Sequence, residues 1–272
     1  MSVNRTQELC GLVSGSTVYD LAQPLEAQIP VSTNHPGFRM ALLRRHGDMV
    51  RADGSSAANE IIVMGGHTGT HLDALCHVSQ NGMLFGNEDA AGAQCGGRFS
   101  VHGIETIAPI LCRGIMLDIP ALLDVDALEP GMPITGAHLA AATMRQGVEV
   151  RAGDAVLIRS GWASYWTQPE FFLGLTKGVP GPDESTAQWL ADHKVRITGA
   201  ETIAYECIYP GKGHALLPVH RMLLVEKGIH IMEAMNLTEL ARDQVYEFLF
   251  VLTPIKVVGA TGVPVRPVAV KA

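Results

Sequence analysis

The chain has 272 residues, of which 47% are hydrophobic and 17% charged, a balance that is typical of a folded protein with a sizeable core and excludes a disordered one. Its formal net charge of -7 and the lack of any run of five lysines or arginines argue against a nucleic-acid or anionic-membrane surface, because both bind clustered positive charge. We therefore expect one domain over residues 1–272 that takes a small-molecule partner and binds neither nucleic acid nor membrane.

The chain starts with MSVNRTQELCGLV, which lacks the long apolar segment of a secretory signal, and no later stretch approaches eighteen consecutive apolar residues. We therefore expect a cytoplasmic protein. The first predicted element is a strand at the apolar run of residues 61–64, and a Gly-rich loop is expected over residues 82–97. Between them lies a histidine-rich motif.

Helices and strands are expected to alternate downstream of this loop. Thr135 and Asp183 are typical N-caps, and each precedes a helix, over residues 135–147 and 183–193. Strands are predicted at residues 114–119, from residue 154 and at residues 195–203. This alternation is typical of an α/β domain.

The last third of the chain continues the alternation. Pro218 starts a helix that Gly228 ends, since proline suits the first turn and glycine the position after the last one. The residues IHIME then predict a strand, a short helix follows Asn236, and YEFLFVLTPIKV is rich in β-formers. The tail GATGVPVRPV is expected to be a loop that leads to an edge segment. The whole pattern predicts an α/β fold with a mixed sheet.

The histidine-rich motif is IIVMGGHTGTHLDALCHV, in which His67, His71, Asp73 and His77 fall within eleven residues. Imidazole and carboxylate groups suit zinc, manganese or iron, and three protein ligands with an open position are typical of a catalytic metal site. The glycines at positions 65, 66 and 69 allow an irregular backbone, so the ligands are expected to converge from a loop and its exit. The alternative is a chance set of polar residues near a turn.

Most of the other histidines are expected to be solvated or locally hydrogen-bonded, because they are scattered along the chain. They are His35, His46, His102, His138, His193, His214 and His230. His35 is the one that we expect to reach a pocket, since the sequence His-Pro-Gly orders its loop.

The residues HTGTHLDALCH at positions 67–77 resemble the H-x-G-T-H-x-D-x-x-x-H signature of the cyclase-like metal-dependent hydrolase family, which includes bacterial kynurenine formamidase and isatin hydrolase. RSGW at 159–162, LPVHRMLLVEKGIHIMEAMNL from 217, YEFLF from 246 and GATGVPVRPVAV from 259 are similar to this family's later blocks. The resemblance therefore covers nearly the whole chain. It implies the family's swivelling β/β/α fold and a homodimer or homotetramer.

The resemblance also implies roles for the motif's residues. His67, His71 and Asp73 would bind a first divalent metal, zinc or manganese, and His77 would transfer protons at the reaction centre. In two-metal members of the family, the aspartate also bridges to a second metal, which His220 and Glu233 would hold here. One or two ions per chain are thus expected.

Two departures from the formamidase pattern affect how far these roles apply to this sequence. Leu75 stands where formamidases commonly have proline, which makes the motif more similar to that of isatin hydrolases. His220 and Glu233 are thirteen positions apart, one more than we expect of formamidases. The first departure favours a cyclic substrate, and the second leaves a one-metal site as an alternative.

A metal in this site would lower the pKa of water from 15.7 toward roughly 7 and polarise a carbonyl, while His77 would pass a proton to the leaving nitrogen. We therefore expect a hydrolase that opens an amide bond of a small aromatic or cyclic substrate, such as isatin or N-formylkynurenine. Side chains that could contact such a substrate, with core packing as the alternative for each aromatic one, are His35, Phe38, Phe85, Trp162 and Trp166.

Three other functions stay open. The first is a lactone hydrolase of the same family, and the second is a non-catalytic metal-binding or assembly protein. The third is a cysteine hydrolase that uses Cys76 within the motif, although a small buried residue is the simpler interpretation. Five cysteines without a C-x-x-C pair argue against a disulfide framework.

Overall fold

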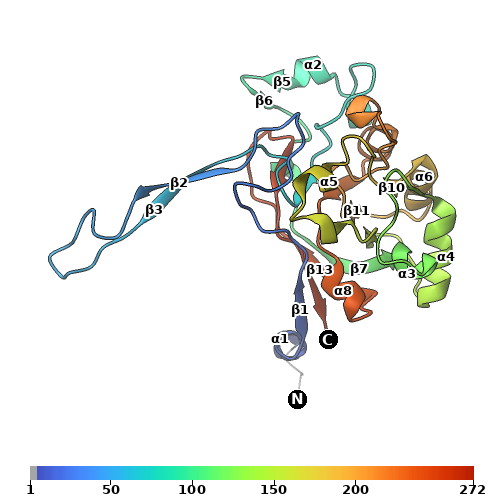
Figure 1. The fold of residues 1–272 in the computed structure, drawn as a ribbon, viewed down its shortest axis with the longest axis horizontal. Coiled ribbons are helices and arrows are strands. Elements are labelled where there is room, and N and C mark those ends of the chain that lie inside the picture. Colours follow the sequence, from blue (N-terminus) through green and yellow to red (C-terminus); the bar gives the residue numbers. More distant parts are fainter. Residues whose placement is uncertain (1–4) are drawn as a thin grey trace.

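The structure, a computed structural model, describes residues 5–272 and is built around a curled nine-stranded sheet in the order β1-β15-β13-β7-β9-β11-β12-β4-β14 (Figure 1). Four central strands are parallel: β7 (Ile110–Asp118), β9 (Ala155–Arg159), β11 (Ile197–Ala200) and β12 (His230–Glu233). Antiparallel strands flank them on both sides: β1 (Thr17–Asp20), β15 (Val268–Lys271), β13 (Glu247–Leu252), β4 (His71–Asp73) and β14 (Gly262–Pro264). This mixed sheet confirms the expected α/β class.

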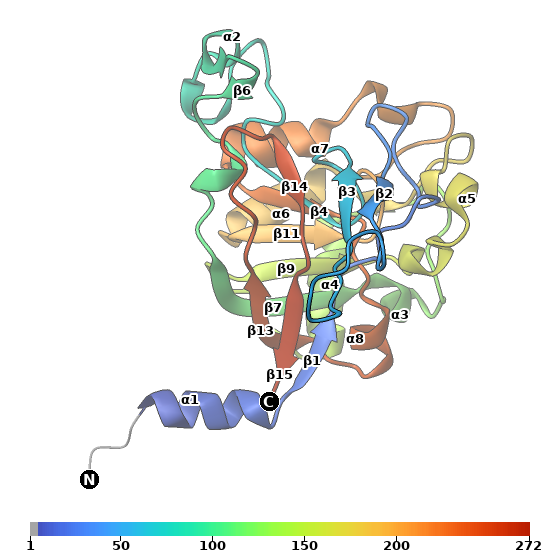
Figure 2. The ribbon, with the colours of Figure 1, turned by 90° about the vertical axis from the view of Figure 1, so that its left-hand side faces the viewer.

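The central strands are buried on both faces, which explains their nearly continuous apolar sequences. In β7, Ile115 and Leu117 pack in one core cluster, and Met116, which points the other way, packs in another. The first cluster lies under the helices on the outer face, α4 (Gly136–Gln146) and α6 (Glu184–Asp192). The second lies inside the curl, where β1, β13 and β15 close over it (Figure 2).

The two capped helices form as the sequence predicts. The Thr135 hydroxyl accepts a hydrogen bond from the His138 N–H at 3.2 Å, and the Asp183 carboxylate accepts one from the Thr186 N–H at 3.0 Å. Each cap is worth about 1 kcal/mol. Gly147 ends α4 with a φ of 66°, in the left-handed region that glycine adopts without strain.

The helix expected after Pro218 has two parts. One α-helical turn, α7 (Pro218–His220), runs directly into a π-helical segment, η5 (Arg221–Lys227), which ends at Gly228 as expected. A π-helical turn hydrogen-bonds to the fifth residue along the chain, one further than in an α-helix, and is frequently found at functional sites. Here the change of winding comes directly after His220.

The Gly-rich stretch is more structured than the expected loop. It contains the 3-10 turn η1 (Phe85–Asn87), the turn α2 (Ala90–Ala93) and the start of a small hairpin. Asp89 caps α2 by accepting a hydrogen bond from the Gly92 N–H. The remaining short elements are β5 (Gln94–Cys95), β6 (Arg98–Phe99), η2 (Ile104–Thr106), α3 (Ile119–Leu123), β8 (Pro133–Ile134), η3 (Trp162–Tyr165), α5 (Pro169–Leu173), β10 (Gly181–Pro182), η4 (Gly213–Ala215) and α8 (Thr238–Arg242).

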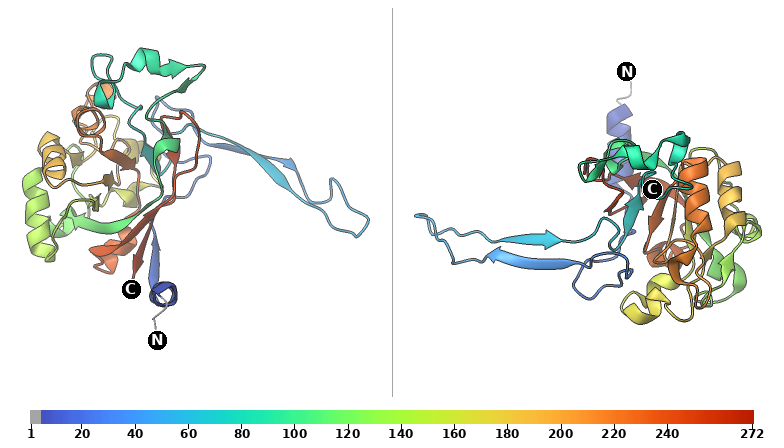
Figure 3. Two further views of the ribbon diagram at one scale, coloured as in Figure 1. Left: turned by 180° about the vertical axis from the view of Figure 1, so that it is seen from behind. Right: turned by 90° about the horizontal axis from the view of Figure 1, so that it is seen from above.

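Two elements stand apart from the body of the molecule. The hairpin of β2 (Arg39–Arg44) and β3 (Asn59–Val63) projects far from the sheet (Figures 1 and 3), and we call residues 39–63 the arm. The helix α1 (Arg5–Ser14) extends from the end of β1 and has no buried residue (Figure 2). Within residues 5–272, no helix combines the length and the apolar character needed to cross a membrane.

Candidate metal centre

The histidine-rich motif forms a tight turn that leads into β4, near one side of the sheet. His71 and Asp73 are two positions apart on this strand, so their side chains lie on the same face. In the register of the antiparallel pair with β12, Glu233 lies directly opposite His71. His67 lies in the turn before β4, and its imidazole is brought back to Asp73. The candidate ligands thus converge from a loop and its exit.

Glycine is required where β14 passes the turn. Gly262 lies opposite Asp73, and a Cβ at this position would lie 2.6 Å from His67 Cε1. A Cβ on Gly66 would lie 2.4 Å from the Gly262 carbonyl oxygen. Because both distances are below van der Waals contact, a larger residue at either position would displace the backbone or the His67 ring.

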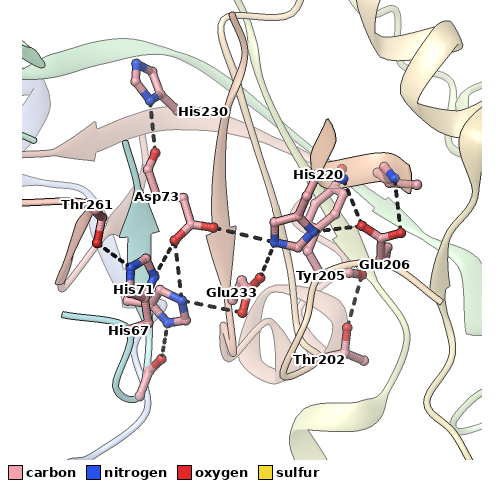
Figure 4. Close-up of polar contacts among 12 residues, drawn as sticks. His67, His71, Asp73, Thr202, Tyr205, Glu206, His220, His230, Glu233 and Thr261 are labelled. Atoms are coloured by element: carbon pink, nitrogen blue, oxygen red, sulfur yellow. Dashed lines mark hydrogen bonds and ion pairs between the residues drawn. The ribbon is translucent and has the colours of Figure 1, made fainter. Parts of the chain in front are cut away.

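Five side chains form two triads that share one carboxylate (Figure 4). The potential ligand atoms of His67, His71 and Asp73 lie within 4.8 Å of one another, and so do those of Asp73, His220 and Glu233. His67 Nδ1 is 2.8 Å from Asp73 Oδ1, and His220 Nε2 is 2.9 Å from Glu233 Oε1. The shared carboxylate is fully buried, and the other four are at most 8% exposed.

Three observations fit this donor set to one or two divalent ions. The fully buried Oδ2 of Asp73 has no hydrogen-bond partner, although such an atom is costly to leave unpaired. His71 donates its Nδ1–H to the Gly69 carbonyl at 2.8 Å, so its Nε2 lone pair faces Asp73 and Glu233. Nitrogen and oxygen donors of this kind suit zinc and manganese alike.

Glu206, which the sequence analysis did not single out, holds His220 in place. Its carboxylate accepts hydrogen bonds from His220 Nδ1 at 2.7 Å and from the backbone N–H groups of Val219 and His220. The His220 ring therefore presents Nε2 to Asp73 and Glu233, as a carboxylate behind a metal-binding histidine does. Nothing in the local sequence around Glu206 distinguishes it from a surface acid, because its role depends on the fold.

Close contacts between the buried groups shift the pKa values of the cluster in opposite directions. Burial lowers the pKa of His220, but its close contacts with the carboxylates of Asp73, Glu206 and Glu233 outweigh this effect and raise the pKa well above its usual value. Burial raises the pKa of Asp73, but the neighbouring imidazoles of His77, His220 and His67 hold it well below its usual range. The buried carboxylates thus require positive charge, which protons or metal ions can supply.

His77 lies beside the cluster and is not part of either triad. Its ring stacks on His67 with 4.0 Å between the centroids, and its centroid is 6.3 Å from that of His220. Burial lowers the pKa of His77 to about 3, so its imidazole is neutral at physiological pH. A neutral imidazole next to potential metal ligands can accept a proton.

A cavity of about 40 Å³ opens between the triads and two loops. His35 lines it, as the sequence predicts for a residue that reaches a pocket, and its ring stacks on His67 at 5.0 Å. On the same wall the Ser32 hydroxyl lies 3.4 Å from His214 Nδ1, a weak contact between the two loops. His214 was expected to be solvated or locally bonded, since its sequence neighbours GKGHALL carry no signal for a site.

The four aromatic residues proposed for substrate contact lie outside this cavity. Phe38, Trp162 and Trp166 are buried in a third core cluster, in which Trp162 donates its indole N–H to the Phe172 carbonyl at 2.9 Å. Phe85 packs beside Gly228 and 5.9 Å from the His102 ring. Their contact with a substrate stays a prediction.

Cys76 also lies near the site, but its chemistry does not suit a nucleophile. It is buried, and burial raises the pKa of its thiol to about 11. The thiol is therefore neutral at physiological pH, whereas a nucleophilic cysteine needs the thiolate. All five cysteines are free thiols.

Comparison with known proteins agrees with this architecture. A model of the cyclase family matches residues 19–207. Isatin hydrolase from Roseibium aggregatum is 23% identical over 222 residues, which cover 80% of this chain and 76% of that protein. The crystal structure of a novel cyclase superposes with a TM-score of 0.85 at 27% identity, covering 100% of this chain and 94% of the other. Isatin hydrolase A from Ralstonia solanacearum superposes with a TM-score of 0.75 at 22% identity, covering 100% of this chain and 98% of the other.

Proposed function

The chain belongs to the cyclase family, and we propose that it is a metal-dependent hydrolase that opens an amide bond of a small cyclic or aryl substrate with water. The fold and the donor set support a hydrolytic site, and the isatin hydrolase among its relatives supports the class of substrate. Leu75, which differs from the formamidase pattern, favours a cyclic amide over an aryl formamide.

The observation that carries this proposal is the position of His77. Asp73 belongs to two complete triads. His77 lies beside them with a neutral, buried imidazole that belongs to neither triad. A structural metal site closes its coordination and has no use for an extra proton acceptor, whereas a hydrolytic site requires one.

The two triads would hold one or two divalent ions, zinc or manganese. Such an ion would make water a stronger acid and polarise the carbonyl that is attacked. Asp73 would serve both positions through its two oxygens, because each triad contains it. Glu206 would keep the His220 ring oriented toward the second position.

His77 would move the proton. Its ring stacks on that of His67 beside both triads, so it can accept a proton from the attacking water and then pass it to the departing nitrogen, which leaves as an amine. No covalent intermediate on the enzyme is needed. For a cyclic amide the product remains one molecule, with a new carboxylate and a free amino group.

The polar groups on the opposite wall would orient the substrate. Ser32, His35 and His214 line the cavity and can donate hydrogen bonds to a second carbonyl oxygen. A cavity of about 40 Å³ has room for little more than one water molecule, so an aromatic substrate requires the loops that carry Ser32 and His214 to separate. Their single contact of 3.4 Å opposes this only weakly.

The test combines metal content with turnover on purified protein. Elemental analysis should find one or two equivalents of zinc or manganese per chain, and hydrolysis of isatin, N-formylkynurenine and a γ-lactone is measured before chelation, after it and after refilling. Turnover that is lost and restored while the circular dichroism spectrum is unchanged supports the hydrolase. A protein that unfolds on chelation and never turns over any of the three would instead be a structural metal protein. Hydrolysis of the lactone alone would overturn the amide as substrate.

A further inference from the structure

A second cavity adjoins the histidine-rich turn. None of the residues that line it lines the small cavity at the metal centre. Its walls come from the hairpin of β5 and β6, from Gly66 in the turn and from residues 259–262, which lead into β14. Its volume of about 510 Å³ lies within the range of small-molecule sites. This cavity therefore has room for a small organic molecule, which the metal cavity lacks.

Backbone contacts hold the two main walls together. The Phe99 N–H donates a hydrogen bond to the Gly259 carbonyl at 3.0 Å, and the Gly259 N–H donates one to the Glu105 carboxylate at 2.8 Å. A Cβ on Gly259 would lie 2.4 Å from the Phe99 carbonyl oxygen, so only glycine allows this approach. The fold itself thus fixes the hairpin against the segment before β14.

Arg98 is the only charged residue that lines this cavity. Within residues 5–272 its guanidinium has no hydrogen-bond or ion-pair partner, whereas Arg113 and Arg159 each contact a carboxylate. A guanidinium offers N–H donors in a planar fork that matches the two oxygens of a carboxylate. The lining therefore favours an anion.

The Thr261 hydroxyl joins this cavity to the metal centre. Its oxygen lies 2.9 Å from His67 Nε2 (Figure 4), and Thr261 also lines the cavity. Since His67 Nδ1 faces Asp73, Nε2 can carry the ring hydrogen and donate it to Thr261, whose own O–H then has no acceptor within residues 5–272. Arg98 and Thr261 thus offer the same cavity two donors without acceptors.

The remaining lining suits a flat apolar group. Four of the lining residues are glycines, whose backbone a planar ring can approach closely. Phe99, which is half-buried, supplies an aromatic side chain. We propose that the cavity binds a small aromatic carboxylate, with its carboxylate on Arg98 and Thr261 and its ring beside Phe99.

A molecule of this class is also what the proposed hydrolase releases. Opening an aryl cyclic amide with water leaves an aromatic ring and a new carboxylate in one molecule. The cavity would then hold product one hydrogen bond away from His67. That the ligand is the product rests on the proposed function, whereas the binding of an aromatic carboxylate does not.

The experiment measures the binding of benzoate to the full-length protein by isothermal titration calorimetry. Metal-free protein is used beside the zinc-loaded form, because a carboxylate can also bind a zinc ion directly. Arg98→Met removes the guanidinium, and Thr261→Val removes the hydroxyl and keeps the shape of the side chain. Arg44→Met, which changes an exposed arginine of the arm, is the matched control. Circular dichroism checks that each protein is folded.

We expect wild type and the Arg44 variant to bind one benzoate per metal-free chain. The Arg98 variant should bind it about 10- to 100-fold more weakly and the Thr261 variant about 10-fold more weakly, because each loses a hydrogen bond to a charged group. Benzamide, which keeps the ring and lacks the charge, should bind wild type less tightly than benzoate does.

Three results would overturn the proposal: a wild type that does not bind benzoate, equal affinity of the Arg98 variant and its control, or inorganic phosphate that binds more tightly than benzoate. The measurement on metal-free protein involves no turnover. Its failure is therefore separate from that of the proposed hydrolase.

Discussion

Glu206 accepts two hydrogen bonds from His220, one from the ring Nδ1 at 2.7 Å and one from the backbone N–H at 2.8 Å. The two residues are fourteen positions apart in the sequence and come from a loop and a helix start. This pair decides which ring nitrogen faces the cluster. His220 would therefore contact an ion directly, whereas Glu206 would orient the His220 ring without contacting the ion (Figure 4).

Glu206→Gln should weaken binding of the ion that we propose His220 and Glu233 hold. A neutral amide is a poorer acceptor for the His220 N–H, and loss of such support typically costs 10- to 100-fold in metal affinity. Titration of the metal-free protein with Zn²⁺, followed calorimetrically, measures the change. Glu149→Gln, an exposed acid far from the site, is the control and should bind as wild type does. Equal affinity of the Glu206 variant and the control would remove Glu206 from the site.

His77→Ala should lower kcat by 10²- to 10⁴-fold, the usual contribution of a general acid–base group, while the metal content per chain is unchanged. Turnover of the best substrate and elemental analysis on the same preparation provide the two values. His193→Ala, a histidine bonded only to its own helix, should leave both as they are. If metal and turnover fall together in the His77 variant, His77 is a ligand.

The metal-free protein should lose stability as the pH rises from neutral. The pKa of His220 is raised by its carboxylate neighbours in the folded protein, so the folded state holds a proton that the unfolded chain releases near pH 6.5. This stabilisation is complete below about pH 6.5 and disappears as the pH rises through the raised pKa. Urea unfolding of metal-free protein at a series of pH values between 6 and 9 measures it. His220→Asn should flatten this slope, and an unchanged slope would assign the effect to other groups.

Metal loading should release that same proton. At neutral pH the ion must displace it from His220, so the apparent affinity rises with pH over the range below the raised pKa. Calorimetry in two buffers of different ionisation enthalpy counts the protons released per ion. A pH-independent affinity with no proton released would contradict the protonated state of His220.

Gly262→Ala should damage the first triad. The new Cβ would lie 2.6 Å from His67 Cε1, so either the ring or β14 must move, at a cost of about 1–3 kcal/mol. The thermal midpoint and the zinc content should both fall. Gly11→Ala, where nothing lies within 4 Å of the added Cβ, is the control and should leave both unchanged. A variant that keeps full zinc content would show that the turn adapts to the methyl group.

Local sequence predicted the elements that depend on local signals. Thr135, Asp183 and Gly147 mark helix ends through hydrogen bonds and backbone angles that involve only near neighbours, so those helices formed where expected. The π-helical turn after His220 was not predictable in this way, since its winding departs from the regular period. Only part of the arm was predicted: the strand expected at residues 61–64 overlaps β3, whereas β2 was not expected. Exposed strands do not alternate apolar and polar residues as half-buried ones do.

The motif by itself indicated that histidines and an aspartate would gather at a loop and its exit, because the glycines at positions 65, 66 and 69 allow an irregular backbone. Only the tertiary structure decided their partners. The register of β4 and β12 placed Glu233 opposite His71, and the packing of α7 on the loop after β11 joined Glu206 to His220. It also placed His214 at the cavity and the four aromatic residues away from it. Such contacts between distant segments depend on strand order and packing, which no local pattern encodes.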